Sequence, residues 1–193
     1  MSPDKIRCPW PGSNELMIRY HDEEWGVPVH EDRKLFEFMV LDSFQAGLSW
    51  QIVLNKREGF RSAFADFNPE EVAQFGKKEI EILKQDKSII RNQLKIKSTI
   101  SNSQHFIDIQ NKFGSFDKFI WQFTEGITLV NKWENMDDIP VSTAESDAMS
   151  DALINRGFKF VGTTICYAFM QAAGMVNDHL ISCFRYNELK GFD

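Results

Sequence analysis

The sequence has little cysteine and little proline, and it has no long apolar run. Of its 193 residues, three are cysteine and six are proline. An odd and sparse set of cysteines argues against the disulfide framework of a small secreted protein. The opening segment lacks the apolar run of a signal peptide, and no stretch reaches the roughly 18 uninterrupted apolar residues of a membrane helix. We therefore expect a cytoplasmic protein that does not enter the membrane.

The chain also lacks an excess of positive charge. Its formal net charge is −6, which excludes a protein that holds DNA through its overall charge alone. The charges are unevenly placed: residues 77–97 hold seven Lys/Arg and three Asp/Glu, whereas residues 125–151 hold one Lys and seven Asp/Glu. This distribution indicates either two solvated helix faces or a basic face that binds a polyanion beside an acidic one.

Alternating apolar and polar residues are absent over any long stretch, and no internal repeat occurs. Apolar residues instead recur at helical spacing, which predicts an all-α fold. With 42% hydrophobic and 13% aromatic residues, the chain can bury a core without a partner. We expect residues 1–193 to form a single domain of two closely packed helical lobes and to be a monomer.

Helix boundaries can be placed from periodicity and capping residues. The segment Asn68–Pro69 supplies an N-cap and a proline at the first helical position, and Ser142–Glu145 has the pattern of a capping box. An irregular connection is expected over 126–140. Helices are predicted over residues 32–45, 49–64, 77–85, 92–113 and 115–123, from 69 onward, from the capping box to 156, and from 163 to 174.

A short turn bounded by two glycines joins the last two predicted helices. Between Gly157 and Gly162 the backbone should leave several amide groups unpaired at the positive end of the following helix, where Thr163 and Thr164 begin. Such a turn can bind one DNA phosphate, with Lys159 nearby. The alternative is an ordinary connection between two helices.

Four potential metal ligands lie near the two ends of the chain. Cys8 and His21 are near the start, and His179 and Cys183 occupy positions i and i+4 near the end, which would place them on one face of a helical turn. A Cys2His2 set suits a closed, structural zinc site that ties the ends together. Coincidental placement remains the alternative, because the spacing is not that of a zinc finger.

Large aromatic rings are concentrated in the first fifty residues. Trp10, Tyr20, Trp25 and Trp50 occur there together with Asp42. If Trp10, Tyr20 and Trp50 converge, they form a slot for a flat and cationic heterocycle, with a carboxylate to accept its N–H groups. Ordinary core packing of the rings and a solvated or capping role for Asp42 are the alternatives.

Several motifs in this order resemble those of the 3-methyladenine DNA glycosylase I family, within the helix-hairpin-helix superfamily. The resemblance extends from Arg7 to Cys183. It is carried by the segments Arg7–Trp10, Tyr20–Pro28, Gln45–Trp50, Arg156–Tyr167 and Asn177–His179. It implies an all-α helix-hairpin-helix fold with one structural zinc ion, which joins the N- and C-terminal segments.

The resemblance assigns a role to each candidate site residue. It implies base stacking by Trp10, Tyr20 and Trp50, a DNA-facing turn at Gly47 and Leu48, and a glycine-bounded turn that binds phosphate. The implied zinc ligands are Cys8, His21, His179 and Cys183, and the implied phosphate-binding residues are Gly157, Lys159, Gly162, Thr163 and Thr164. The family commonly has Glu where this chain has Asp42, so the base acceptor is one methylene shorter.

The implied activity belongs to base-excision repair of double-stranded alkylated DNA. The enzyme would flip 3-methyladenine out of the duplex, hydrolyse its N-glycosidic bond and release the free base, leaving an abasic site. Asp42 would recognise the base, and no lysine is placed to support a lyase step. Two alternatives are a zinc-stabilised module that binds damaged DNA without turnover, and a glycosylase for a different modified base.

Overall fold

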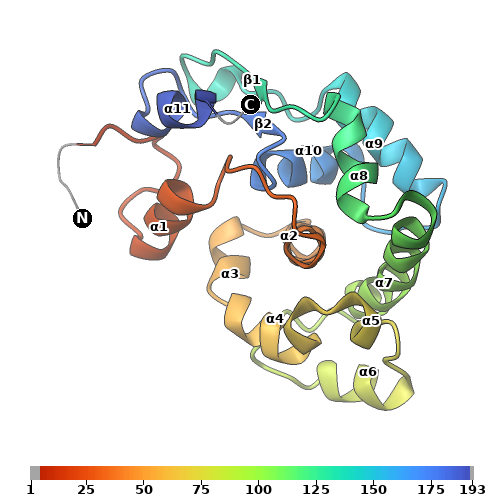
Figure 1. The fold of residues 1–193 in the computed structure, drawn as a ribbon. Helices are drawn as coiled ribbons and strands as arrows, with labels where there is room; N and C mark the ends of the chain where they lie inside the picture. Colours follow the sequence, from red (N-terminus) through yellow and green to blue (C-terminus); the bar gives the residue numbers. More distant parts are fainter. Residues whose placement is uncertain (1–4, 192–193) are drawn as a thin grey trace.

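The computed structural model describes residues 5–191, which form a mostly helical protein (Figure 1). Helix α2 (Asp32–Gln45) lies at the centre, and the other helices form an open ring around it. Every side chain from Leu35 to Phe44 is buried. The apolar stripe predicted for this segment therefore continues around the helix, as expected for a helix at the centre of a core.

The remaining elements follow in chain order. The first half of the chain contains α1 (Glu15–Glu23), α3 (Trp50–Leu54), α4 (Arg57–Ala63), η1 (Ala65–Phe67), α5 (Pro69–Val72), α6 (Lys77–Leu83) and α7 (Gln93–Phe113). The second half contains α8 (Phe116–Ile120), η2 (Trp121–Thr124), β1 (Leu129–Val130), η3 (Met136–Asp138), α9 (Ala144–Ile154), α10 (Thr163–Ala172), β2 (Val176–Asn177), α11 (Phe184–Glu188) and η4 (Leu189–Gly191).

Local capping explains several boundaries that the sequence predicts. The Asn68 side chain accepts hydrogen bonds from the backbone amides of Glu70 and Glu71, so α5 begins at Pro69 as expected. Helix α7 ends at Gly114, whose φ of +90° is a left-handed conformation that favours glycine. Helix α2 has the bounds predicted for it.

Other boundaries differ from the prediction. The helix expected over 49–64 is divided into α3 and α4, because the chain turns at Lys56 and directs Arg57 toward the carboxylates of Glu24 and Glu37. The capping box before α9 pairs Thr143 with Ser146, one residue later than predicted. The segment predicted as one helix over 115–123 begins as α8 and tightens into η2.

The fold also contains one short parallel pair of strands. Strand β1 pairs with β2, with Leu129 opposite Val176. Two residues per strand are too few to produce an alternating pattern, so the all-α prediction missed this pair. No helix within residues 5–191 is both long and apolar enough to cross a bilayer.

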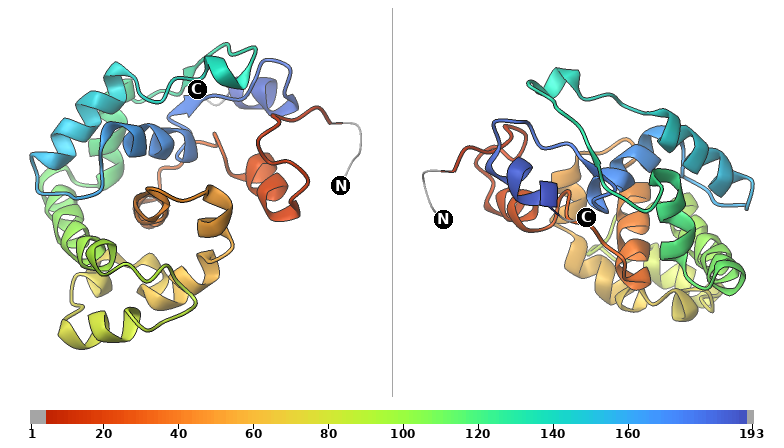
Figure 2. Two further views of the ribbon diagram at one scale, coloured as in Figure 1. Left: turned by 180° about the vertical axis from the view of Figure 1, so that it is seen from behind. Right: turned by 45° about the horizontal axis from the view of Figure 1, so that its top comes forward.

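The two ends of the described chain lie side by side. The N-terminal segment runs beside α11 in two views of the ribbon (Figures 1 and 2). The backbone amide of Phe184 donates a hydrogen bond of 2.9 Å to the carbonyl oxygen of Ile6. This contact brings the first and last parts of the chain to the same side of the protein.

Candidate active site and metal centre

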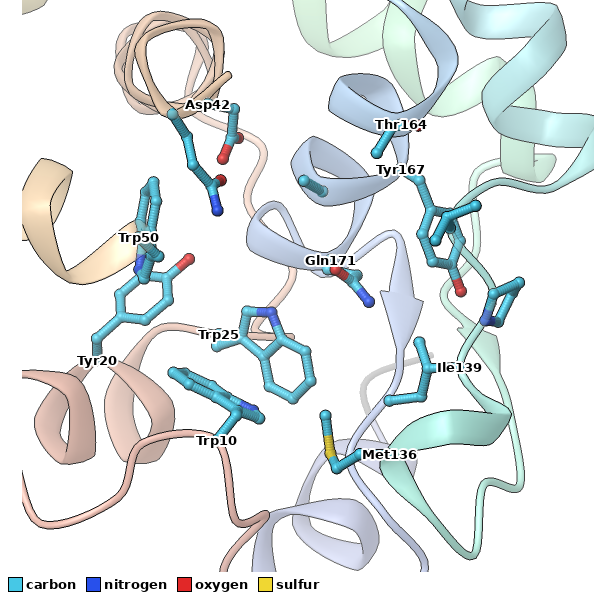
Figure 3. Close-up of a pocket in the computed structure, with 14 residues that line it drawn as sticks. Trp10, Tyr20, Trp25, Asp42, Trp50, Met136, Ile139, Thr164, Tyr167 and Gln171 are labelled. Carbon is cyan, nitrogen blue, oxygen red and sulfur yellow. The ribbon is translucent and has the colours of Figure 1, made fainter. Parts of the chain in front are cut away.

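A cavity of about 350 Å³ opens between the N-terminal helices and α10 (Figure 3). One wall carries aromatic rings from α1, from α3 and from the segments that flank α1. Asp42 and Gln45 reach the cavity from α2. The opposite wall consists of Met136, Ile139, Pro140, Val141, Thr164, Tyr167, Ala168 and Gln171.

The aromatic residues singled out in the sequence converge on this cavity. The rings of Tyr20 and Trp50 have their centroids 5.1 Å apart, and those of Trp10 and Tyr20 are 6.3 Å apart. Trp25 joins them, with its ring centroid 5.2 Å from that of Trp10. Tyr20 and Trp25 are buried, whereas Trp10 and Trp50 are half-buried and line the cavity. This wall can stack a flat ligand.

Asp42 is the buried carboxyl group of the cavity. Its side chain comes from the last part of α2, and the residue is only 2% exposed. Within residues 5–191 its Oδ2 atom has no hydrogen-bond partner, and burial raises the pKa of Asp42 well above its ordinary value. The indole N–H groups of Trp10 and Trp50 also have no partner there. Orphaned donors and an acceptor at one cavity indicate a polar ligand.

Sequence reasoning missed most of the wall opposite the aromatic rings, where only Thr164 was a predicted site residue. Thr164, Tyr167, Ala168 and Gln171 follow one another at helical spacing along α10, so periodicity from Thr164 could have found them. The segment 136–141 is irregular apart from η3, and no sequence pattern connects it to the cavity. Trp25 was counted among the rings but was not predicted as a site residue.

The turn at Gly47 and Leu48 lies directly after α2. Gly47 has a φ of +81°, a left-handed conformation, and Leu48 is 39% exposed. Behind the turn, the buried Lys95 donates hydrogen bonds from Nζ to the carbonyl oxygens of Phe44 and Ala46, at 2.8 and 2.7 Å. These bonds satisfy carbonyl groups at the end of α2 and hold the turn in place.

In the turn between α9 and α10, only the first of the two bounding glycines has a left-handed conformation, whereas Gly162 has a φ of −61°. Gly157 has a φ of +92°, and a Cβ atom there would lie 2.7 Å from Nε2 of His105. The Asn102 side chain holds the backbone of Lys159 through two hydrogen bonds of 2.9 Å. In the described chain, the amides of residues 160–162 have no protein acceptor. These donors are therefore free to bind an anion.

The predicted phosphate-binding residues of this turn do not all offer their side chains. The Thr163 hydroxyl already interacts with the Asp147 carboxylate and with the hydroxyl of Ser146. Thr164 is exposed and lines the cavity, while Lys159 and Gly162 are exposed on the turn. The geometry thus leaves Lys159 and backbone amides, rather than the Thr163 hydroxyl, available to an anion.

The four predicted metal ligands form one buried cluster. One donor atom from each of Cys8, His21, His179 and Cys183 lies within 4.8 Å of the others. The Sγ atom of Cys183 is 3.5 Å from Nε2 of His21 and 3.5 Å from Nδ1 of His179, which is 3.7 Å from Sγ of Cys8. The last two ligands precede α11 in a turn rather than on a helix, so the predicted helical placement was wrong.

Polar groups around the cluster orient both imidazole rings. Nδ1 of His21 lies 2.8 Å from Asp22, which is held in turn by Arg7, and Nε2 of His179 lies 3.0 Å from the carbonyl oxygen of Trp25. The other nitrogen of each ring therefore faces the sulfur atoms. A hydrogen bond from the Cys8 thiol lowers the pKa of Cys183. The cluster thus already favours a thiolate, the form that binds metal.

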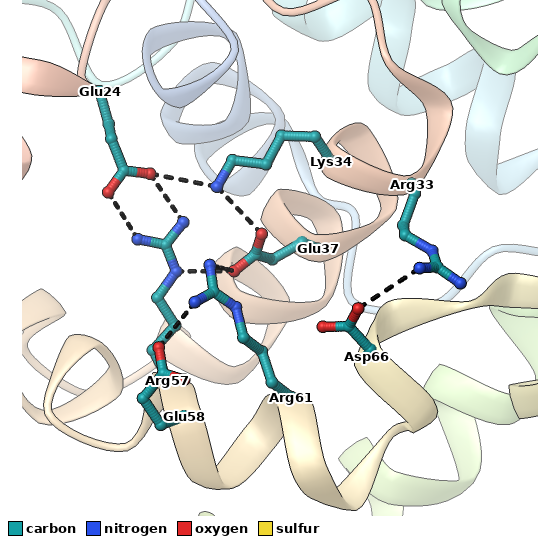
Figure 4. A network of polar contacts seen from close by, with 8 residues as sticks. All are labelled: Glu24, Arg33, Lys34, Glu37, Arg57, Glu58, Arg61 and Asp66. Atoms are coloured by element: carbon teal, nitrogen blue, oxygen red, sulfur yellow. Dashed lines mark hydrogen bonds and ion pairs between the residues drawn. The ribbon is translucent and has the colours of Figure 1, made fainter.

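A network of ion pairs surrounds Arg57 (Figure 4). The Arg57 guanidinium donates two hydrogen bonds of 2.7 Å to Glu24 and one of 2.6 Å to Glu37. Hydrogen bonds from Arg57 lower the pKa of Glu24 to about 2 despite the opposing effect of burial. The network connects the end of α1, which carries Tyr20, to α2 and α4.

Comparisons with known proteins agree with this geometry. The methyladenine glycosylase family model matches residues 10–186. The chain is 47% identical to the DNA-3-methyladenine glycosylase 1 of Escherichia coli, over 93% of this chain and 96% of that protein. It is 41% identical to the DNA-3-methyladenine glycosylase of Haemophilus influenzae, over 92% and 96% of the two chains.

Solved structures are similar over the same range. A crystal structure of 3-methyladenine DNA glycosylase I superposes with a TM-score of 0.91 at 47% identity, covering 93% of this chain and 98% of that one. The Staphylococcus aureus 3-methyladenine DNA glycosylase I, studied for its recognition of 3-methyladenine, gives a TM-score of 0.89 at 32% identity, covering 92% and 94%. By sequence and by fold, this chain belongs to the methyladenine glycosylase family.

Proposed function

We propose that this protein excises 3-methyladenine from alkylated double-stranded DNA by hydrolysing the N-glycosidic bond. The observation that carries the proposal is the aromatic cavity with the orphaned Asp42 carboxyl group in its wall. A base can reach such a cavity only after it has been flipped out of the duplex. The products are the free base and an abasic site in the DNA.

Asp42 recognises the base in this proposal. Methylation at N3 makes the nucleobase cationic and a good leaving group, so the enzyme has mainly to extrude and hold it. The rings of Tyr20, Trp50 and Trp10 present electron-rich faces that favour a cation. The cationic base favours the ionised form of Asp42, so this residue, which has no partner in the described protein, accepts N–H groups of the base and counters its charge. Both contacts favour the alkylated base over neutral adenine.

Two surface turns contact the DNA on either side of the cavity in this proposal. Leu48 fills the gap beside the flipped nucleotide, because it projects from an exposed turn next to the aromatic wall. The amides that follow Lys159 bind a backbone phosphate at the start of α10, the arrangement of a helix-hairpin-helix element. Because these contacts are local, the negative net charge of the protein does not prevent binding.

The Cys/His cluster is a fitting site for one structural zinc ion. Its S–N distances of 3.5 to 3.7 Å match the edges of a tetrahedron with Zn–S bonds of about 2.3 Å and Zn–N bonds of about 2.0 Å. Two cysteines and two histidines leave no open position for substrate. Zinc would therefore supply stability, by joining the segment that carries Trp10 and Tyr20 to the C-terminal segment.

The reaction ends with hydrolysis. Lysine is absent from the part of the cavity wall that the structure describes, so no amine is placed there to form a Schiff base with the sugar. We propose that the protein acts as a monomer, since the cavity is completed by residues of one chain. Borohydride should consequently trap no covalent complex between the protein and DNA.

The test is chromatography of the bases released from methylated DNA by the purified protein. We expect 3-methyladenine with little 7-methylguanine from the wild type, and at least tenfold less from Asp42→Asn. Asp66→Asn is the matched control, because Asp66 is 70% exposed and pairs with Arg33 away from the cavity. Release of a different base would indicate another specificity, and no release from folded, zinc-loaded protein would indicate a binding module.

A further inference from the structure

The buried carboxylate of Asp178 lies between the metal cluster and the cavity. It directly precedes His179, is 1% exposed, and is approached by four hydrogen-bond donors. Its Oδ1 atom accepts hydrogen bonds of 2.7 Å from Asn131 and from the indole of Trp133. Its Oδ2 atom accepts hydrogen bonds of 2.6 Å from the Tyr167 hydroxyl and 2.8 Å from Nε2 of Gln171.

These bonds decide which way the Gln171 amide faces. Because Nε2 is the donor to Asp178, the Gln171 carbonyl oxygen must point away from that carboxylate. Gln171 lines the cavity, where its side chain projects between Trp25 and Tyr167 (Figure 3). Within residues 5–191 no protein group donates a hydrogen bond to its Oε1 atom. The Gln171 Oε1 atom is therefore an unpartnered acceptor at the cavity, whereas one N–H of the amide is held by Asp178.

We propose that Gln171 is a second recognition residue for the base and that Asp178 is the residue that positions it. In this inference, which rests on the proposed function, the Gln171 carbonyl oxygen accepts a hydrogen bond from the exocyclic amino group of 3-methyladenine. Asp42 reaches the base from α2, and Gln171 reaches it from α10. Two acceptors on different elements fix the orientation of the ring within the stack.

An acceptor in this position selects against a second class of alkylated base. 3-Methylguanine has a carbonyl oxygen where 3-methyladenine has its amino group, so it would place two acceptors against each other. Because Asp178 holds the amide, Gln171 cannot exchange the positions of Oε1 and Nε2 without breaking the 2.8 Å bond. A fixed amide therefore discriminates between the two bases, whereas a freely rotating one would accept both.

The experiment compares Gln171→Ala, Asp178→Asn and the double variant with the wild type. Asp178→Asn replaces one acceptor oxygen by a donor, which removes the constraint on Gln171 while keeping the size of the side chain. Two quantities are measured on zinc-loaded protein: the Kd for free 3-methyladenine from tryptophan fluorescence, and the ratio of 3-methyladenine to 3-methylguanine released from methylated DNA. Zinc content and the urea midpoint are recorded for each variant.

We expect each single variant to weaken base binding by about two- to tenfold, the range for one neutral hydrogen bond. The release ratio should fall by a similar factor. The double variant should lose no more than Gln171→Ala, because Asp178 acts through Gln171. Asn131→Ala is the control: it removes a donor from Oδ1, so it should lower the urea midpoint without changing the release ratio.

The outcomes separate this inference from the proposed function. Multiplicative losses in the double variant, or an unchanged release ratio in Gln171→Ala, would overturn the inference. If Asp178→Asn does not fold, the release ratio of Gln171→Ala decides alone. A wild-type protein that releases no base overturns the proposed function, whereas wild-type release with an unaffected ratio in Gln171→Ala overturns only the role of Gln171.

Discussion

Because Asp42 is buried, the variant Asp42→Asn should become more stable relative to the wild type as the pH rises. Asp42 is 2% exposed, and its pKa is raised well above the ordinary value by burial alone. The folded protein therefore keeps a proton on this group at pH values where the unfolded chain, with a pKa of about 3.9, has lost it. Since the folded state binds more protons, the free energy of unfolding falls as the pH rises above about 4.

The size of this effect follows from proton linkage. Between the unfolded and the folded pKa values of Asp42, one proton costs about 1.4 kcal/mol of stability per pH unit. Asp42→Asn has no group to titrate at this position. Its free energy of unfolding should therefore rise relative to that of the wild type by this amount for each pH unit. The unpaired amide of the variant adds a cost that does not depend on pH.

Urea unfolding at pH 5, 6 and 7, followed by tryptophan fluorescence with zinc in excess, measures the difference between the two proteins. Effects of pH on other groups, including the metal ligands, are common to both and cancel. Asp66→Asn should show no comparable growth of the difference with pH, because the Asp66 side chain is 70% exposed. A constant difference between Asp42→Asn and the wild type would refute the reasoning, because it would mean that Asp42 titrates normally.

Three further predictions concern the frame of the site. Arg57→Ala should lower the free energy of unfolding by about 1.5–3 kcal/mol in urea titrations, because it removes three hydrogen bonds to Glu24 and Glu37, which keep other cations as partners. A loss below about 1 kcal/mol would contradict this. Cys8→Ser should reduce the bound zinc measured by mass spectrometry and lower the Tm. If a chelator changes the Tm of the wild type no more than that of the variant, the metal is not structural. Gly157→Ala should cost about 1–3 kcal/mol through its φ of +92° and its contact with His105, and should weaken binding to duplex DNA while free 3-methyladenine binds normally.

The sequence predicts those parts of the fold that local chemistry determines. The bounds of α2 follow from its apolar content, and the start of α5 follows from the Asn68 cap. The division between α3 and α4 could not be predicted, because the bend there is stabilised by the bonds from Arg57 to carboxylates on other elements. Helix α1 begins after the N-cap Asn14, a capping residue that apolar periodicity alone does not reveal.

The candidate site likewise has parts that the sequence predicts and parts that depend on tertiary contacts. Residue types identified the aromatic wall and the four metal ligands, but spacing could not show that Cys8 meets His179 across 171 positions. The segment 136–141 has neither a motif nor a regular period, and its contact with the cavity arises only from tertiary packing. Gln171 lacks a distinguishing pattern too, since its role depends on which way Asp178 turns the amide.

The meeting of the two chain ends has a consequence for biogenesis. A ribosome adds about 5–20 residues per second, so on the order of ten seconds or more separate the emergence of His21 from that of Cys183. Throughout that interval the nascent chain exposes two metal ligands and the tryptophans beside them without their counterparts. The base-binding wall is consequently among the last parts of the protein to be fixed in place. A messenger truncated just before His179 would yield a polypeptide that has most of the core but lacks two of the four ligands that hold this wall.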